Sequence, residues 1–197
     1  YVSGPDVLRD ATGELATAEA LGGAMLHATT SGIADRIFAD EIELLFAARM
    51  AIGLLVRDVA PSADPATRVA THLDTLVPAD PAEPYDMREL VHAICDDRAW
   101  LELQPDRGGG MLCGIARIGG RSIGIMANQP IVAGGVIDRA AIAKATRLAA
   151  LCATCRLPIV SLVDSRGFMP GAQEGAGGIV AAGAALLAWF VVRCSRS

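Results

Sequence analysis

The chain has 197 residues, of which 52% are hydrophobic and 20% charged, so it is able to bury a core and does not have the composition of a disordered protein. Its formal net charge of -5 argues against a nucleic-acid-binding protein, which would present a basic face. The five cysteines lack the spacing of a disulfide framework, which fits a reducing compartment, and we expect a cytoplasmic location.

Two helices are predicted in the first 55 residues. Thr17 is placed to cap a short helix that runs through His27, and Asp40 is placed to cap a longer one over Glu41–Leu55. Apolar side chains surround most of the second helix, so we expect it to be buried between layers. The first ten residues have neither the basic start nor the apolar run of a signal peptide.

Residues 56–84 are rich in Pro, Ala and Asp. Five of the ten prolines fall between Pro61 and Pro84, and no glycine lies between Gly53 and Gly108. Such a composition is typical of a semi-rigid connector. The chain is therefore predicted to divide into a first folded part (1–55), a connector (56–84) and a second folded part (85–197).

The second part begins with a helix and a hairpin. Asp86 and Glu89 occupy the N-cap and N3 positions of a capping box, followed by an apolar run. Two alternating runs, Met111–Ile118 and Arg121–Asn128, are joined by Gly119-Gly120, which predicts a β-hairpin.

The rest of the chain predicts a parallel βαβ unit. An amphipathic helix from Asp138 to Cys155 is followed by a strand-length apolar run from Leu157 to Val163, which is expected to be covered on both faces. Residues 175–192 carry no charge, and we expect a buried helix with close neighbours rather than a membrane anchor. The pair Cys152 and Cys155 could be redox-active, half of a zinc site, or two buried thiols, and we favour the thiols.

The sequence contains none of the common catalytic signatures of hydrolases, metalloproteases, phosphate loops or dinucleotide-binding loops. Either the protein is not an enzyme or its catalysis depends on backbone groups. The loop Asp164-Ser-Arg-Gly-Phe-Met-Pro-Gly171 favours the second reading, because ligands in open α/β sheets bind at the carboxyl ends of strands. Gly167 would let the backbone turn its amides into a cleft, where they could stabilise an oxyanion. The alternative is a plain strand-to-helix turn.

Several stretches resemble, in the right order, the carboxyltransferase (beta) subunit of biotin-dependent acyl-CoA carboxylases of the propionyl-, acetyl- and methylcrotonyl-CoA type. Residues 4–14 and 20–35 are similar to the end of the family's N-terminal domain. Pro84-Tyr-Asp-Met-Arg-Glu89 is similar to the opening of its C-terminal domain, Gly124-Ile-Met-Ala-Asn-Gln-Pro130 to a hairpin in it, and the 164–171 loop to its biotin-side loop.

The resemblance implies an α/β fold of the crotonase-like (ClpP/crotonase) β-β-α superhelix type, with the end of one domain in 1–55 and the start of a second in 85–197. It implies carboxyl transfer from carboxybiotin to the α-carbon of an acyl-CoA, with backbone amides stabilising the anions that form. The cofactor would be biotin on a carrier protein or biotin carboxylase subunit, without a metal. Partners would be acyl-CoA and copies of the same chain in a dimer-based oligomer or hexamer, with neither nucleic acid nor membrane. The implied site residues are the amides of Gly167 and Phe168 as oxyanion donors, with ligand contacts from Asn128, Gln129, Pro130, Met169, Pro170 and Gly171.

Three departures from the family pattern shape the expectation. Arg166 stands where the family usually has Pro, and the two Gly-Gly-Ala loops of the family would fall outside this chain. We therefore expect a partial carboxyltransferase that is inactive by itself. Two alternatives stay open: a biotin-dependent acyl-CoA decarboxylase subunit, and a non-catalytic fragment or assembly piece.

Overall fold

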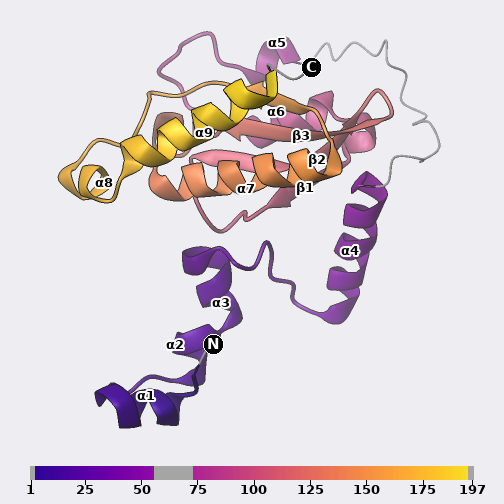
Figure 1. The fold of residues 1–197 in the computed structure, drawn as a ribbon. Coiled ribbons are helices and arrows are strands. Elements are labelled where there is room, and N and C mark those ends of the chain that lie inside the picture. Colours follow the sequence, from indigo (N-terminus) through magenta and orange to yellow (C-terminus); the bar gives the residue numbers. More distant parts are fainter. Residues whose placement is uncertain (1–2, 56–72, 195–197) are drawn as a thin grey trace.

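The computed structural model describes residues 3–55 and 73–194, with side chains up to Ala188. It is a mixed α/β structure in which helices lie on both faces of a four-stranded sheet of order β1-β2-β3-β4 (Figure 1). Strands β1 (Trp100–Leu103), β2 (Met111–Ile118) and β3 (Arg121–Asn128) are antiparallel, and β4 (Ile159–Leu162) runs parallel to β3.

The predicted hairpin is confirmed at the predicted residues. Strands β2 and β3 pair from Met111 with Asn128 to Ile118 with Arg121. Gly119 and Gly120 close the turn with φ of +57° and +74°, values that glycine adopts without strain. The carboxylate of Asp96, in the 3-10 turn Asp96–Arg98, accepts hydrogen bonds from both glycine N–H groups, at 2.8 and 2.7 Å.

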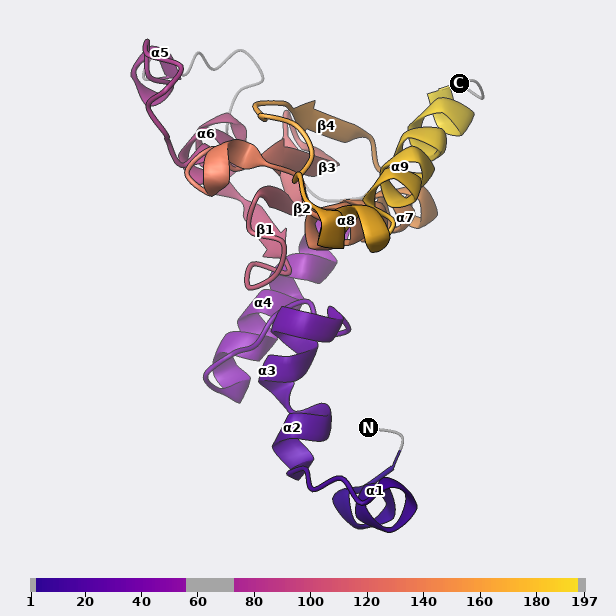
Figure 2. The same cartoon turned by 90° about the vertical axis from the view of Figure 1, so that its left-hand side faces the viewer.

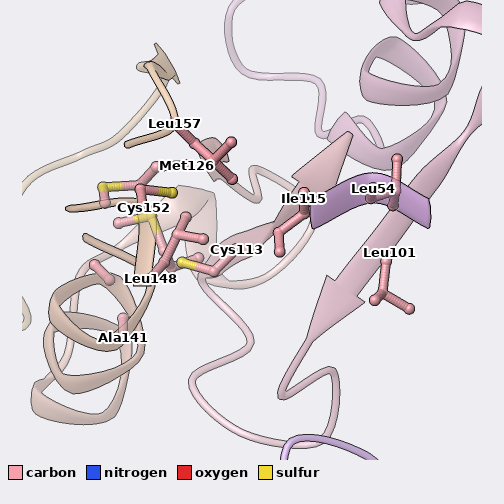
Figure 3. Close-up of a cluster of buried hydrophobic side chains, with 11 residues drawn as sticks. Leu54, Leu101, Cys113, Ile115, Met126, Ala141, Leu148, Cys152 and Leu157 are labelled. Atoms are coloured by element: carbon pink, nitrogen blue, oxygen red, sulfur yellow. The ribbon is translucent and has the colours of Figure 1, made fainter. Parts of the chain in front are cut away.

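The predicted parallel βαβ unit is also confirmed. Helix α7 (Arg139–Cys155) connects β3 to β4, and its N-cap Asp138 accepts a hydrogen bond from the Ala141 N–H at 2.7 Å. The predicted apolar side of α7 covers one face of the sheet, where its side chains meet those of β2 and β3 (Figure 3). The buried residues of this side include Ile142, Ala145, Leu148, Ala149 and Cys152.

Two predictions about burial in this region are wrong. Strand β4 is an edge strand, so its Ser161 is exposed and its other residues are only half-buried. After the short helix α8 (Ala172–Ala176), helix α9 (Ile179–Cys194) packs against α7 along one side only. Val180 and Leu187 on α9 are therefore 80% and 63% exposed. Within the described ranges, no helix combines the length and the apolar character that a membrane span requires.

The opposite face of the sheet is covered by α6 (Met87–Ile94). Its N-cap Asp86 accepts a hydrogen bond from the Arg88 N–H at 2.9 Å, as the predicted cap requires. Glu89 does not complete the capping box, because its carboxylate lies 3.5 Å from Arg98 instead. Successive residues of β2 and β3 point to opposite faces, so the sheet carries one core under α7 and another under α6.

The first part of the chain begins with α1 (Pro5–Thr12), α2 (Ala18–Gly22) and α3 (Ala24–Leu26), followed by a π-helical turn (His27–Ser31). Thr17 caps α2 as predicted, accepting from the Ala20 N–H at 3.1 Å. The predicted single helix is nevertheless interrupted at Gly23, which is extended. Both views show α1–α3 reaching away from the sheet (Figures 1 and 2).

Helix α4 (Glu41–Leu55) has the predicted bounds, and Asp40 accepts from the Glu43 N–H at 2.9 Å. The prediction that α4 is buried between layers is wrong in this structure, because only its last turn reaches the sheet. Leu54 is the one buried side chain of the helix, while Phe46 is 71% exposed. Arg117 of β2 donates to the Gly53 carbonyl oxygen at 2.8 Å and so fixes this last turn.

Residues 30–35 also dock on the sheet unit. The Gln104 N–H donates to the Asp35 carbonyl oxygen at 2.8 Å, and the Gln104 side-chain amide donates to the Gly32 carbonyl oxygen. Of the predicted connector, residues 56–72 lie outside the described residues, and 73–84 contain the short helix α5 (Leu73–Leu76). The division into domains stays a prediction.

Candidate functional site: the loop after strand β4

The 164–171 loop leaves the carboxyl end of β4 and is paired with the segment that precedes α7. The Ile137 N–H donates to the Gly167 carbonyl oxygen and the Met169 N–H donates to the Ile137 carbonyl oxygen, both at 2.9 Å. These two bonds form a parallel bridge between Ile137 and Phe168. The loop is therefore fixed by backbone bonding on one side.

The two predicted oxyanion donors differ in this geometry. The Gly167 N–H donates to Ser165 Oγ at 3.0 Å, inside a closed turn, which is not the free orientation that we expected. The N–H and the carbonyl oxygen of Ile137 both form hydrogen bonds with the residues that flank Phe168. The Phe168 N–H therefore points away from Ile137. In the part of the chain that the structure describes, the Phe168 N–H has no hydrogen-bond partner. One of the two predicted amides is thus available to a ligand.

A pocket of about 540 Å³ lies beside the first half of the loop. It is lined by residues 77–85, by residues of the 130–134 turn, and by residues 164–166. Gly167 and Phe168 are not among the described residues that line it. Asp164 and Arg166 contribute a carboxylate and a guanidinium to the wall, where the family pattern would have a proline in place of the arginine.

One side-chain hydrogen bond crosses this pocket wall. The Tyr85 hydroxyl donates to Asp164 Oδ2 at 2.9 Å. Burial raises the pKa of Tyr85 to about 12, and the hydrogen bond to Asp164 adds to this rise. Tyr85 therefore stays a neutral hydrogen-bond donor at ordinary pH. No sequence pattern predicts this pair, because its members lie 79 positions apart with no shared motif.

Asn128 and Gln129, predicted as ligand contacts, lie inside the fold instead. Gln129 is fully buried, its side-chain oxygen accepts from the Met87 N–H at 2.8 Å, and its side-chain nitrogen donates to Asp86 at 2.6 Å. Asn128 is 3% exposed and donates to the Gly135 carbonyl oxygen at 3.1 Å. Both side chains hold neighbouring segments in place, because their bonds leave them directed into the protein.

The remaining predicted contacts are spread along the loop. Pro130 lines the pocket, and its carbonyl oxygen accepts from the Gly134 N–H at 3.0 Å. Met169 is half-buried in the bridge, and Pro170 is exposed. Gly171, with φ of +142°, precedes α8 and accepts from the Gly175 N–H at 3.0 Å. The structure thus brings Pro130 to the pocket but does not gather all six residues around it.

The cysteines and possible metal ligands are separate from this loop. Cys152 is a buried free thiol, as the favoured reading predicted for the end of α7, whereas Cys155 is only half-buried. Burial raises the pKa of Cys152 to about 11, which keeps the thiol protonated and unreactive. Among the described residues, no group of three or more His, Cys, Asp or Glu is placed to hold a metal ion.

The chain is similar to members of one protein family over almost its whole length. The family model for the carboxyl transferase domain matches residues 1–192. The propionyl-CoA carboxylase beta chain of Cereibacter sphaeroides is 38% identical over 193 residues, which are 95% of this chain and 38% of the relative. The methylmalonyl-CoA decarboxylase subunit alpha of Veillonella parvula is 36% identical over 193 residues, with the same two shares of 95% and 38%.

A solved structure shares the fold. The crystal structure of transcarboxylase 12S, described as a hexamer, superposes with a TM-score of 0.88 at 34% sequence identity and covers 96% of this chain and 38% of its own. The architecture is accordingly crotonase-like α/β, as predicted. The chain spans about 38% of the length of these relatives. Because the family model matches nearly every residue, the chain belongs to the carboxyl transferase domain family.

Proposed function

We propose that this chain is part of the carboxyltransferase component of a biotin-dependent acyl-CoA carboxylase. The reaction would transfer a carboxyl group to the α-carbon of an acyl-CoA. The observation that carries the proposal is the continuous family match over residues 1–192, together with the likeness to a propionyl-CoA carboxylase beta chain. Since the chain spans about 38% of such relatives, the activity is proposed for the complete subunit.

The loop after β4 is the part of this chain that we assign to the biotin side. The biotin group, held on a carrier protein supplied with a biotin carboxylase subunit, supplies the carboxyl group when it is bound. The available Phe168 N–H fits an oxygen acceptor such as the one that a cyclic urea presents. It would donate to an oxygen that gains negative charge during transfer, a contribution of about 3 kcal/mol to the barrier for a well-placed donor. Gly167 does not fit this role while its N–H is bonded to Ser165.

The proposal extends to partners and organisation. Residues 1–55 would close an N-terminal domain and residues 85–197 would open a C-terminal domain, with acyl-CoA as substrate. A homo-oligomer is supported by the hexamer reported for transcarboxylase 12S and by the exposed apolar side chains of α4. A cytoplasmic location is supported by the free thiols among the described cysteines.

Two other functions compete with this one. A biotin-dependent decarboxylase is favoured by the likeness to the Veillonella parvula subunit. A non-catalytic assembly piece would need only the packing surfaces of the chain and no available amide.

The test uses the complete subunit with free biotin and either malonyl-CoA or methylmalonyl-CoA, and measures release of the decarboxylated CoA ester. We expect biotin-dependent turnover from the complete subunit and none from the 197-residue chain. Absence of turnover in the complete subunit would refute an enzymatic role. Forward carboxylation of propionyl-CoA with the biotin carboxylase partner, ATP and bicarbonate then separates a carboxylase from a decarboxylase, since the decarboxylase would not support it.

A further inference from the structure

The 164–171 loop has little burial to hold it. It follows an edge strand, and Val163 at its start is 79% exposed. Bonds to residues 134–137 hold one side of it: the bridge to Ile137, the Arg166 N–H donating to the Gly134 carbonyl oxygen at 3.2 Å, and the Ser165 hydroxyl donating to the Gly135 carbonyl oxygen at 2.7 Å. Contacts with other elements at Asp164 and at the Phe168 ring, the two ends of the 164–168 segment, then decide how firmly the rest of this segment is held.

Tyr85 supplies the contact at the first end. Its hydroxyl donates to Asp164 Oδ2 at 2.9 Å, and its carbonyl oxygen accepts from the Ile131 N–H at 3.2 Å. Tyr85 thus joins the segment before α6 to the 130–134 turn through its backbone and to the loop through its side chain. A hydrogen bond from a phenol to a carboxylate is stronger than one between two neutral groups. The contact therefore stabilises the loop more than an equally exposed neutral pair would.

Gly183 supplies the contact at the second end. It interrupts a run of alanines in α9, Ala181-Ala182-Gly183-Ala184-Ala185, where glycine is the poorer helix former. A Cβ built at Gly183 would lie 3.2 Å from two ring atoms of Phe168, which is tighter than ordinary packing. Gly183 itself is buried, although its neighbours Val180 and Leu187 are exposed. The missing side chain makes room for the Phe168 ring on α9.

We propose that Tyr85 and Gly183 are positioning residues that hold the two ends of the 164–168 segment and so, together with the bridge to Ile137, keep the Phe168 N–H in one orientation. Neither residue needs to touch a ligand. The structural part of this inference stands on the contacts at Asp164 and Phe168, and the catalytic part rests on the function proposed above.

The experiment measures hydrogen–deuterium exchange by mass spectrometry on the complete subunit, for Tyr85→Phe and Gly183→Ala. The matched control for the glycine is Gly53→Ala in α4, because a Cβ built at Gly53 meets no atom within 4 Å. Asp164→Asn keeps an oxygen that accepts from the Tyr85 hydroxyl but removes the charge, so its loop exchange should fall between those of the wild type and Tyr85→Phe. We expect exchange in peptides spanning 164–171 to be about tenfold faster in both test variants, which corresponds to about 1.4 kcal/mol. Exchange in 111–128 should not change, and Gly53→Ala should match the wild type in the loop.

Gly183→Ala distinguishes a loss of loop positioning from a general loss of protein stability. Alanine favours the helix, so its thermal midpoint should equal or exceed that of the wild type while the loop loosens. In the same variants we expect kcat to fall about tenfold with an unchanged KM for acyl-CoA. The reason is that the Phe168 N–H donates to the oxygen that gains negative charge during carboxyl transfer and not to the bound acyl-CoA. Unchanged loop exchange in both test variants would overturn the inference. Faster loop exchange with unaltered kcat, in an active wild type, would overturn its catalytic part. An inactive wild type would instead refute the proposed function and leave the exchange result to decide the structural part.

Discussion

Arg147 of α7 and Asp35 form a two-bond ion pair across 112 positions of sequence. The distances are 3.0 Å from Nε to Oδ1 and 2.9 Å from Nη2 to Oδ2. The hydrogen bond to Asp35 raises the pKa of Arg147. Together with the bonds of Gln104, this pair attaches residues 30–35 to the sheet unit, so a part of the predicted first domain packs on the second.

Replacing Arg147 by Ala should loosen this attachment. Because the two side chains are 49% and 38% exposed, the free energy of unfolding should fall by no more than about 1 kcal/mol. Limited proteolysis within residues 27–39 should become several-fold faster. The control is Arg121→Ala, an exposed arginine without an ion-pair partner in the described part of the chain. Equal proteolysis of the two variants would show that Gln104 and the backbone bonds are enough to hold residues 30–35 on the sheet unit.

Phe168→Pro removes the available amide, and Phe168→Leu keeps it. We expect the proline variant of the complete subunit to lose about a hundredfold in kcat, as loss of one oxyanion donor does elsewhere. The leucine variant should lose much less. Proline at this position breaks no hydrogen bond that the structure describes, so the thermal midpoints of the two variants can be compared directly. Similar kcat values in both variants would remove Phe168 from the catalytic site.

Gly167→Val should lower stability and turnover together. Gly167 has φ of +105°, a conformation that valine adopts only with strain of about 1–3 kcal/mol. A matched control is Gly175→Val, because both glycines have open space around the added Cβ and Gly175 lies in the helical turn of α8 without a positive φ. Chemical denaturation and steady-state kinetics on the complete subunit measure the two effects. Equal losses in the two variants would show that bulk, and not backbone strain, is responsible.

The protein should lose stability in alkali through two buried thiols. Burial raises the pKa of Cys113 from 9.0 to about 12 and that of Cys152 from 9.0 to about 11. Above pH 9 the unfolded chain therefore releases protons that the folded chain keeps, and the stability held below that pH is lost as pH rises toward the folded values. Each thiol contributes a slope of about 1.4 kcal/mol per pH unit in its window. Denaturant titrations of wild type and Cys113→Ala across this range should show a flatter dependence in the variant, and parallel curves would contradict the assignment.

The 197-residue chain should self-associate in solution. Ile42, Leu45 and Phe46 on α4 are 66%, 67% and 71% exposed, and apolar surface costs about 25 cal/mol for each Å² left in water. Sedimentation velocity should show species larger than a monomer that increase with concentration. Phe46→Glu should shift the distribution toward monomer, whereas Thr154→Glu on the polar side of α7 should not. A monomer at all concentrations would mean that these side chains need no partner.

Local signals in the sequence predicted most of the elements. The caps at Asp40 and Asp138 and the Gly119-Gly120 turn each depend on residues close in sequence, and their predicted elements formed at the expected positions. The burial of α4 and α9 was predicted wrongly because periodicity reports which helix sides are apolar, not how much of the helix meets a neighbour. Phe46 is as apolar as a core residue and still lies in solvent.

The candidate site was predicted only at the level of the loop. A glycine after a strand indicates where the backbone turns, but the choice between Gly167 and Phe168 as the available donor depends on Ser165 and Ile137. Asn128 is the last residue of β3 and Gln129 follows it, and nothing in their spacing shows that their amides point inward. The contacts of Tyr85 and Gly183 join residues far apart in the chain, which a local pattern does not report.

The carboxylate of Asp96, which accepts from both glycines of the hairpin turn, also bears on the order of folding. A hairpin such as β2–β3 closes on its own within about 1–10 μs, since its contacts are local. Asp96 reaches the turn from 23 and 24 positions upstream, so its bonds form only when the segment carrying β1 returns to the hairpin. The two bonds thus stabilise the chain once β1 has paired with β2, and they favour a three-stranded meander as the unit that forms early in folding. We expect strand β4 to join afterwards, because its pairing with β3 requires the longer crossover through α7.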